Sequence, residues 1–314
     1  MRHRNIYRKM EYQMRDDILP NGIATAQFIE DSNRLNNEDL MDKYGVSART
    51  IRRWRQRLKE SDEEIILTFP ESPSPIYNDY LKLEYERLVV VSDSEIPDHD
   101  PELFEMAARL GDKLGINHLL LNGDILAMDP FSNWPQMDMQ RLDFKRDLGL
   151  AIKTIKTFLN SFDTVDYIIG NHERRLAKQT KGQSNIGMYC EHILGLQYSN
   201  YPYCELSSGG KEILICHPEN FSSTPLAIPR RLAAIHDKNV LAGHSHRICQ
   251  GFSDNGRYWI GEGGTCRSPE RTLYTSMRIT NYSKWTQGFS LIIAGQLYLV
   301  TKDNFDFFYN HVRL

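Results

Sequence analysis

At 314 residues the chain is long enough for one large domain or two smaller ones. A hydrophobic content of 40% with 25% charged residues is ordinary for a soluble globular protein, which excludes a fibrous or membrane-embedded chain. The formal net charge of −3 averages two unlike parts, because residues 1–60 hold 13 Lys and Arg against 9 Asp and Glu, whereas the remainder holds 25 against 32. A basic head on an acidic body predicts a nucleic-acid contact at the head.

The sequence contains no recognisable export or membrane segment. Its first residues, Met1 to Asn5, lead into further charge, and no stretch approaches the roughly 18 apolar residues of a membrane span. The five cysteines are odd in number and form no Cys-x-x-Cys pair, which is typical of free thiols in a reducing compartment. We therefore expect a cytoplasmic protein with no membrane partner. The oligomeric state stays open, a homo-oligomer included.

Residues 1–60 are predicted to form a small all-α domain with helices near 23–32, 37–44 and 48–59. Gly45-Val46-Ser47 is a tight turn whose serine can cap the third helix. This arrangement resembles the helix-turn-helix of small phage terminase subunits, transposases and resolvases, which implies DNA as a partner. The third helix would then contact DNA through residues on its polar face, which are Arg49, Thr50, Arg52, Arg53 and Arg57. Two alternatives stay open, a merely solvated basic face and a surface for protein contacts.

Residues 61–87 read as a linker, because Pro70, Pro73 and Pro75 follow an acidic patch and stiffen the connection. From residue 88 to 314 the pattern is that of a second domain. Strands near 88–92, 118–122 and 165–169 alternate with helices near 101–115 and 138–161, which predicts parallel βαβ units. A helix near 225–236 precedes a strand at 239–242, and a hairpin is expected over 289–300.

Polar residues that suit metal ions follow five of the apolar runs in this second domain. The segments at these strand ends are Ser92-Asp93-Ser94-Glu95, Asn122-Gly123-Asp124, Gly170-Asn171-His172-Glu173, His217, and Gly243-His244-Ser245-His246. In parallel α/β folds, ligands bind beyond the carboxyl ends of strands, where such loops converge. Carboxylates, an amide and imidazoles together form a ligand set for divalent metal ions.

These motifs resemble those of the calcineurin-like metallophosphoesterases, in the order Asp-x-His, Gly-Asp, Gly-Asn-His-Glu, a lone His and Gly-His-x-His, and the resemblance covers roughly residues 88–250. It implies two facing mixed β-sheets flanked by helices, and two divalent metal ions. Asp124 would bridge the two ions. The first ion would also be bound by Asp93 and His246, and the second by Asn171, His217 and His244. Together with a helix-turn-helix head, this body resembles phage or prophage gene content.

One position departs from the family pattern, because Glu95 stands where the family has the histidine of Asp-x-His. Its carboxylate can reach as far as an imidazole nitrogen, so Glu95 is our expected ligand. The exchange adds charge and hardness, which favours Mn²⁺ or Mg²⁺ over Zn²⁺, with Fe as a further candidate. In the alternatives, the first site is weak or empty, or nearby His99 replaces the missing histidine.

The resemblance also implies a mechanism, in which a metal-bridging hydroxide attacks phosphorus and His172 protonates the leaving oxygen as general acid. Arg174 and Arg175 would either bind the substrate phosphate or hold their loop in salt bridges. Our leading interpretation is a metal-dependent phosphodiesterase, a nuclease acting on DNA. A phosphomonoesterase acting on protein or nucleotide is the second, and a DNA-binding module with a degenerate metal site is the third.

Overall fold

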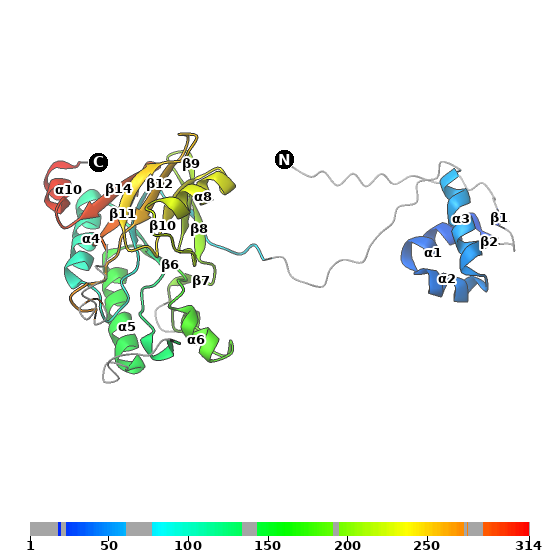
Figure 1. Ribbon diagram of the computed structural model, residues 1–314, viewed down its shortest axis with the longest axis horizontal. Helices are drawn as coiled ribbons and strands as arrows, with labels where there is room; N and C mark the ends of the chain where they lie inside the picture. Colours follow the sequence, from blue (N-terminus) through cyan, green and yellow to red (C-terminus); the bar gives the residue numbers. More distant parts are fainter. Residues whose placement is uncertain are drawn as a thin grey trace. The chain divides into compact units, whose positions relative to one another are not determined.

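The computed structural model describes residues 18–19, 23–60, 77–133, 143–190, 195–272, 275 and 285–313, with side chains of the N-terminal part described over 27–56. The chain divides into two compact units, Met1–Tyr77 and Asn78–Leu314, and each unit is described separately (Figure 1). Residues 61–76 of the expected linker and residues 138–142 of an expected helix lie outside the described residues. None of the helices in the described ranges combines the length and apolar character needed to cross a membrane.

The N-terminal unit contains the three expected helices. Its elements are β1 (Ile18–Leu19), β2 (Ile23–Ala24), α1 (Thr25–Arg34), α2 (Asn37–Tyr44) and α3 (Ala48–Glu60). The Asn36 side chain accepts hydrogen bonds from two backbone N–H groups and caps α2, which ends at Gly45 with a left-handed φ of 62°. Phe28, Leu40, Ile51 and Trp54 form the core of this unit.

The second unit contains two six-stranded mixed sheets. One sheet has the strand order β11 (Ile248–Phe252), β12 (Trp259–Gly263), β10 (Asn239–Ala242), β9 (Lys211–Cys216), β8 (Tyr203–Ser208) and β3 (Lys82–Glu84). The other has the order β14 (Gln296–Thr301), β13 (Gly288–Ile293), β4 (Arg87–Val91), β5 (His118–Asn122), β6 (Thr164–Ile168) and β7 (Gln197–Ser199).

Alternation along the strands sorts their side chains into two cores. On β4, Leu88 and Val90 join a cluster that contains residues of both sheets, whereas Val89 and Val91 face the opposite way. This period of two is what a strand buried on both faces requires. The two sheets therefore face each other across one apolar layer, as the family resemblance implies, and the expected fold class is confirmed.

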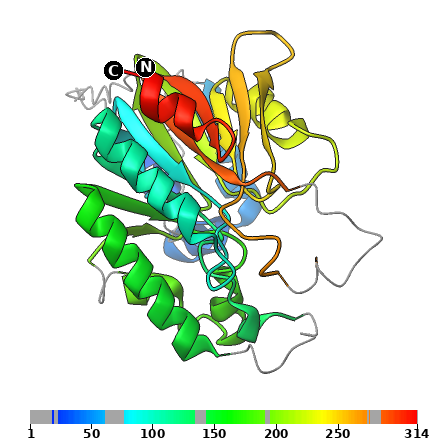
Figure 2. The same ribbon diagram turned by 90° about the vertical axis from the view of Figure 1, so that its left-hand side faces the viewer.

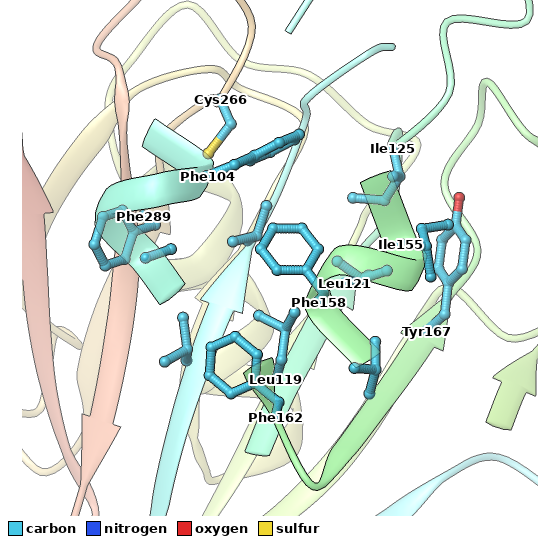
Figure 3. Close-up of a cluster of buried hydrophobic side chains, with 14 of the residues drawn as sticks. Phe104, Leu119, Leu121, Ile125, Ile155, Phe158, Phe162, Tyr167, Cys266 and Phe289 are labelled. Atoms are coloured by element: carbon cyan, nitrogen blue, oxygen red, sulfur yellow. The ribbon is translucent and has the colours of Figure 1, made fainter. Parts of the chain in front are cut away.

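Helices cover the outer faces of the sheets. The helical elements of this unit are α4 (Pro101–Leu114), η1 (Asp129–Phe131), α5 (Phe144–Ser161), α6 (Arg174–Gln179), α7 (Ile186–Tyr189), α8 (Ala227–His236) and α10 (Phe305–His311). Figure 2 shows α4, α5 and α10 along one face of the sheet that contains β4, and Figure 3 shows Phe104 of α4 and Phe158 of α5 packed over Leu119 and Leu121 of β5. On the other sheet, Ala233 of α8 packs in a cluster with β9 and β10.

The second unit starts earlier than the sequence indicates. We expected residues 61–87 to be linker, but Lys82–Glu84 forms β3 and pairs in parallel with β8. Tyr85 stacks on the His118 ring, with the ring centroids 3.9 Å apart. Its hydroxyl also donates to Asp166 at 3.0 Å. These contacts fix residues 78–87 to the second unit.

Strand direction determines where the polar loops lie. β4, β5 and β6 are parallel neighbours in one sheet, and β9 and β10 are parallel neighbours in the other. Because the carboxyl ends of parallel neighbours lie at one edge of a sheet, the loops after these five strands can meet.

Candidate metal centre

The five strand-end loops meet, and they form two adjoining groups of ligand atoms. The first group contains four ligand atoms that all lie within 4.8 Å of one another, one each from Asp93, Asp124, His217 and His244. In the second group, the same holds for Glu95, Asp124 and His172. Asp124 belongs to both groups, which is the position that the sequence resemblance assigns to a bridging carboxylate.

Backbone strain is concentrated at these loops. A left-handed φ is found at five predicted ligands, which are Asp93, Glu95, Asp124, His244 and His246. Residues other than glycine rarely adopt left-handed backbone angles, and each one that does raises the free energy of the folded state by about 1–3 kcal/mol. Strain that recurs at chemically related positions is typical of a functional site.

His217 is oriented for binding a metal ion. Its Nδ1 donates a hydrogen bond to the carbonyl of Asn122 at 2.9 Å, which turns Nε2 toward Asp124 Oδ2, 3.1 Å away. Burial alone would lower the pKa of His217, but the Asp124 and Asp93 carboxylates raise it to about 10. Without a metal the imidazole is therefore protonated, and a metal ion would displace that proton.

Asn171 supplies the clearest test of whether the residues fit a metal ion. Its Oδ1 is buried and has no hydrogen-bond partner within the described part of the chain. A buried amide oxygen without a partner is costly unless something else coordinates it. Both neighbours of Asn171 in the chain lie against Asp124, since Gly170 packs on its side chain and the His172 N–H donates to it. A divalent cation at Asp124 would be a suitable partner for this oxygen, so the residues fit a metal ion.

The carboxylates at the centre are held ionised. Burial alone would raise the pKa of Asp124, but the imidazoles of His172 and His217 bring it below the usual range of an aspartate. His246 Nε2 lies 3.2 Å from both Asp93 Oδ1 and Glu95 Oε1. These carboxylates raise the pKa of His246 to about 9 against the effect of its burial.

Glu95 lies in the centre, as predicted, but it has a partner that the sequence did not indicate. Arg267 Nη1 donates to Glu95 Oε2, and Arg267 Nη2 donates to Asp98 Oδ2 at 2.9 Å. Burial would raise the pKa of Glu95, whereas the Arg267 guanidinium holds it well below the usual range. His99, the alternative ligand, stacks on Phe104 and belongs to neither ligand group found among the described residues.

His172 is fixed by two neighbours. Its backbone N–H donates to Asp124 Oδ1 at 2.8 Å, and Arg175 Nη2 lies 2.8 Å from its Nε2. Because a guanidinium can only donate, Nε2 accepts, and the neutral ring carries its proton on Nδ1. Nδ1 lies 3.5 Å from Glu95 Oε2.

The two arginines after His172 both make contacts within the protein. Arg175 Nη1 also donates to the carbonyl of Ala127 at 2.7 Å and to Asp129 at 3.1 Å. Arg174 pairs with Glu219. These contacts favour the loop-holding alternative over the phosphate-binding one for Arg175.

Glu173 is a buried residue of the candidate site to which the sequence reasoning gave no role. Its fully buried carboxylate accepts five hydrogen bonds of 2.8–3.0 Å, whose donors are the backbone N–H groups of Asp124, Ile125, Leu126 and Gly170 and the hydroxyl of Tyr167. The loop after β5 is thereby fastened to the loop after β6. Gly170 allows this close approach, because a Cβ there would overlap the Asp124 side chain.

The predicted DNA-binding residues lie in the other unit, on α3. Ile51 and Trp54 point into its core, while Arg49, Arg52 and Arg53 are exposed. Thr50 lies at the helix start, where its backbone N–H and hydroxyl contact the Ser47 side chain. The side chain of Arg57 lies outside the described residues.

Comparison with known proteins adds structural neighbours only. No protein-family model and no curated protein sequence matches the chain. YfcE, a phosphoesterase from E. coli, aligns at 13% identity over 69% of this chain and 94% of its own, with a TM-score of 0.39. A predicted phosphoesterase from Streptococcus pneumoniae aligns at 13% identity over 69% and 90%, with a TM-score of 0.34. Vps29 from Entamoeba histolytica, complexed with zinc, aligns at 12% identity over 68% and 97%, with a TM-score of 0.34. The chemistry of the centre therefore follows from its own residues.

Replacing Glu173 with Gln should destabilise the second unit. The new amide would turn an N–H₂ group toward backbone donors, and buried groups left without partners cost about 2–5 kcal/mol in total. Chemical denaturation would measure the change. Asp166→Asn is the matched control, because Asp166 is buried but accepts only the Tyr85 hydrogen bond among the contacts described, so we expect a loss of about 1 kcal/mol. Equal losses in the two variants would contradict the role of Glu173.

Proposed function

We propose that the chain is a metal-dependent phosphodiesterase that hydrolyses DNA. The observation that carries this proposal is the meeting of five strand-end loops, which bring carboxylate, amide and imidazole ligands around Asp124. Divalent cations bound there would polarise a phosphoryl oxygen and make a water molecule acidic enough to attack phosphorus. Mn²⁺ is the ion we favour, since carboxylate and amide oxygens predominate among these ligands.

The residues around the centre have distinct tasks in this proposal. Asp124, Asn171, His217 and His244 bind metal, while Glu173 keeps the loops of Asp124 and Asn171 at a fixed separation. His172 would act as general acid toward the leaving oxygen, and Arg175, whose Nη2 lies 2.8 Å from His172 Nε2, fixes the ring.

An exposed aromatic residue beside the centre supports a nucleic-acid substrate. Phe221 is 63% exposed, and its ring lies edge-on to His244 with the centroids 6.4 Å apart. The guanidinium of Arg247 lies 5.6 Å from the same ring and supports it from the protein side. A phenylalanine fixed in this way next to a phosphate-cleaving centre is suited to stacking on a nucleobase. A phosphate monoester of a protein would have no need of it.

Features of the N-terminal unit support DNA, rather than RNA, as the nucleic acid that the protein binds. Exposed Arg49, Arg52 and Arg53 line the polar side of α3, and no ion pair is described for them among the residues of this unit. Arg55 differs, because it donates to Asn37 and to the carbonyl of Ser32 and so holds α3 to its neighbours. Arginines without protein partners on one helix can meet DNA phosphates or bases.

Hydrolysis is the direct test of the function. With Mn²⁺ supplied, the protein should cleave DNA and bis-p-nitrophenyl phosphate, and chelation should abolish both activities. Asp124→Asn keeps the oxygen that accepts from His172 but removes the charge, so turnover should fall by more than the 10–100-fold typical of losing an outer-shell partner. Cleavage of p-nitrophenyl phosphate alone would instead establish a phosphomonoesterase, and inactivity throughout would leave a binding module.

Phe221→Ala tests base stacking. If Phe221 stacks on the substrate, the variant should raise KM for single-stranded DNA by roughly 5–150-fold, in line with the 1–3 kcal/mol of one stacked base. Its activity on bis-p-nitrophenyl phosphate should change little. Phe252→Ala removes an equally exposed phenylalanine and should leave both substrates unaffected. A parallel loss on both substrates would show that Phe221 acts on the centre rather than on bases.

Arg53→Ala tests the N-terminal unit as the DNA contact. One lost phosphate contact should weaken duplex binding and reduce the slope of log affinity against log salt by about one. Fluorescence anisotropy at several salt concentrations would measure both. Arg34→Ala is the control, because Arg34 is an exposed arginine of α1 that pairs with Glu30. Identical salt slopes for the wild type and Arg53→Ala would rule out this contact.

A further inference from the structure

A buried guanidinium lies on the side of the centre that the family pattern assigns to a first metal ion. Arg267 is 4% exposed and donates to both Glu95 and Asp98. It lies 5.6 Å from the Trp285 ring, which in turn lies 4.6 Å from the His246 ring. Asp98 and Trp285 therefore hold the cation against Glu95, on the side of His246.

Among the described residues, no guanidinium or ammonium group is paired with the carboxylates on the other side of the centre. In the described part of the chain, the ion pairs of Asp93 and Asp124 are all with histidines, which can lose their proton to a metal ion. The amide oxygen of Asn171 has no partner there, and His217 Nε2 points toward Asp124 Oδ2, 3.1 Å away, without a hydrogen bond of good geometry. This side is polar, buried and still in need of a cation.

Charge balance distinguishes the two sides. Glu95 in place of a histidine adds one negative charge, and Arg267, which stays protonated at any physiological pH, adds one positive charge. A second dication beside Glu95 would face this guanidinium at short range. Displacing Arg267 to relieve the repulsion would leave buried charges without partners, which is strongly unfavourable.

We propose that the centre binds one divalent metal ion per chain, through Asp93, Asp124, Asn171, His217 and His244, and that Arg267 supplies the second positive charge. This inference rests on the proposed metal-dependent function and corrects its stoichiometry, since the family resemblance implies two ions. Glu95 then serves as the anchor of the guanidinium rather than as a metal ligand, and Glu95 and Arg267 act as a unit.

Metal stoichiometry tests the inference without reference to activity. The full-length protein, freed of metal and titrated with MnCl₂ in a calorimeter, should bind one equivalent tightly. The double variant Glu95→His with Arg267→Met removes the Glu95–Arg267 ion pair and restores the Asp-x-His pattern, so it should bind two. The control Lys238→Met with Glu205→Gln removes another ion pair, in which the two charged atoms lie 2.5 Å apart, and should still bind one.

A spectroscopic measurement covers the case in which the double variant does not fold. The wild-type protein with excess Mn²⁺, after desalting, should give the electron paramagnetic resonance spectrum of an isolated ion rather than that of a coupled pair. Two tight equivalents or a coupled spectrum would overturn the inference and leave the phosphodiesterase proposal intact. Binding of no Mn²⁺ would overturn the proposed function itself. One equivalent in both the wild type and a folded double variant would show that Arg267 is not what limits the number of ions.

Discussion

The carboxylate of Glu173 is the contact on which the geometry of the centre depends. It accepts from the backbone of three consecutive residues after β5, from Gly170 after β6, and from Tyr167 within β6. Two loops that carry ligands are thus fixed to one buried anion, which removes freedom that a metal ion would otherwise have to restrict. Burial raises the pKa of Glu173, and its backbone donors stabilise the charged form.

The same anchoring explains how strained backbone persists at the ligands. Asp93, Asp124 and His244 have left-handed φ values, which cost free energy in isolation. Each is fixed by contacts to neighbouring loops: the Asp93 carboxylate accepts from the His244 backbone at 2.9 Å, and its carbonyl accepts from Thr265 at 2.5 Å. Loops from the two sheets are therefore joined through side chains that also face the centre. The same hydrogen bonds therefore make the loops rigid and hold the candidate ligands in place.

The sequence predicts the parts of this structure whose patterns are local. Strand β5 is recognisable because Leu119 to Leu121 are apolar and a turn with Gly123 follows, and α4 because Asp100 and Gly115 bound it. The strand β3 was missed because only three residues pair and their partner strand lies more than a hundred residues later. Arg267 was missed for a similar reason: it is separated from Glu95 by 172 residues, and an isolated arginine carries no motif. Long-range partners of buried charges have no sequence pattern of their own.

In the proposed function, Glu95 at the position of the histidine in the Asp-x-His pattern would alter the metal centre without dismantling it. A histidine ligand is neutral when bound, so its replacement by a carboxylate requires either a harder cation or a cation supplied by the protein. The contact of Arg267 with Glu95 and Asp98 is the second solution. It keeps a positive charge beside Glu95 whether or not metal is present, so the charge on this side of the centre depends less on metal supply than in a centre filled by two ions. The residues around Asn171 and His217 would then carry the whole dependence on metal.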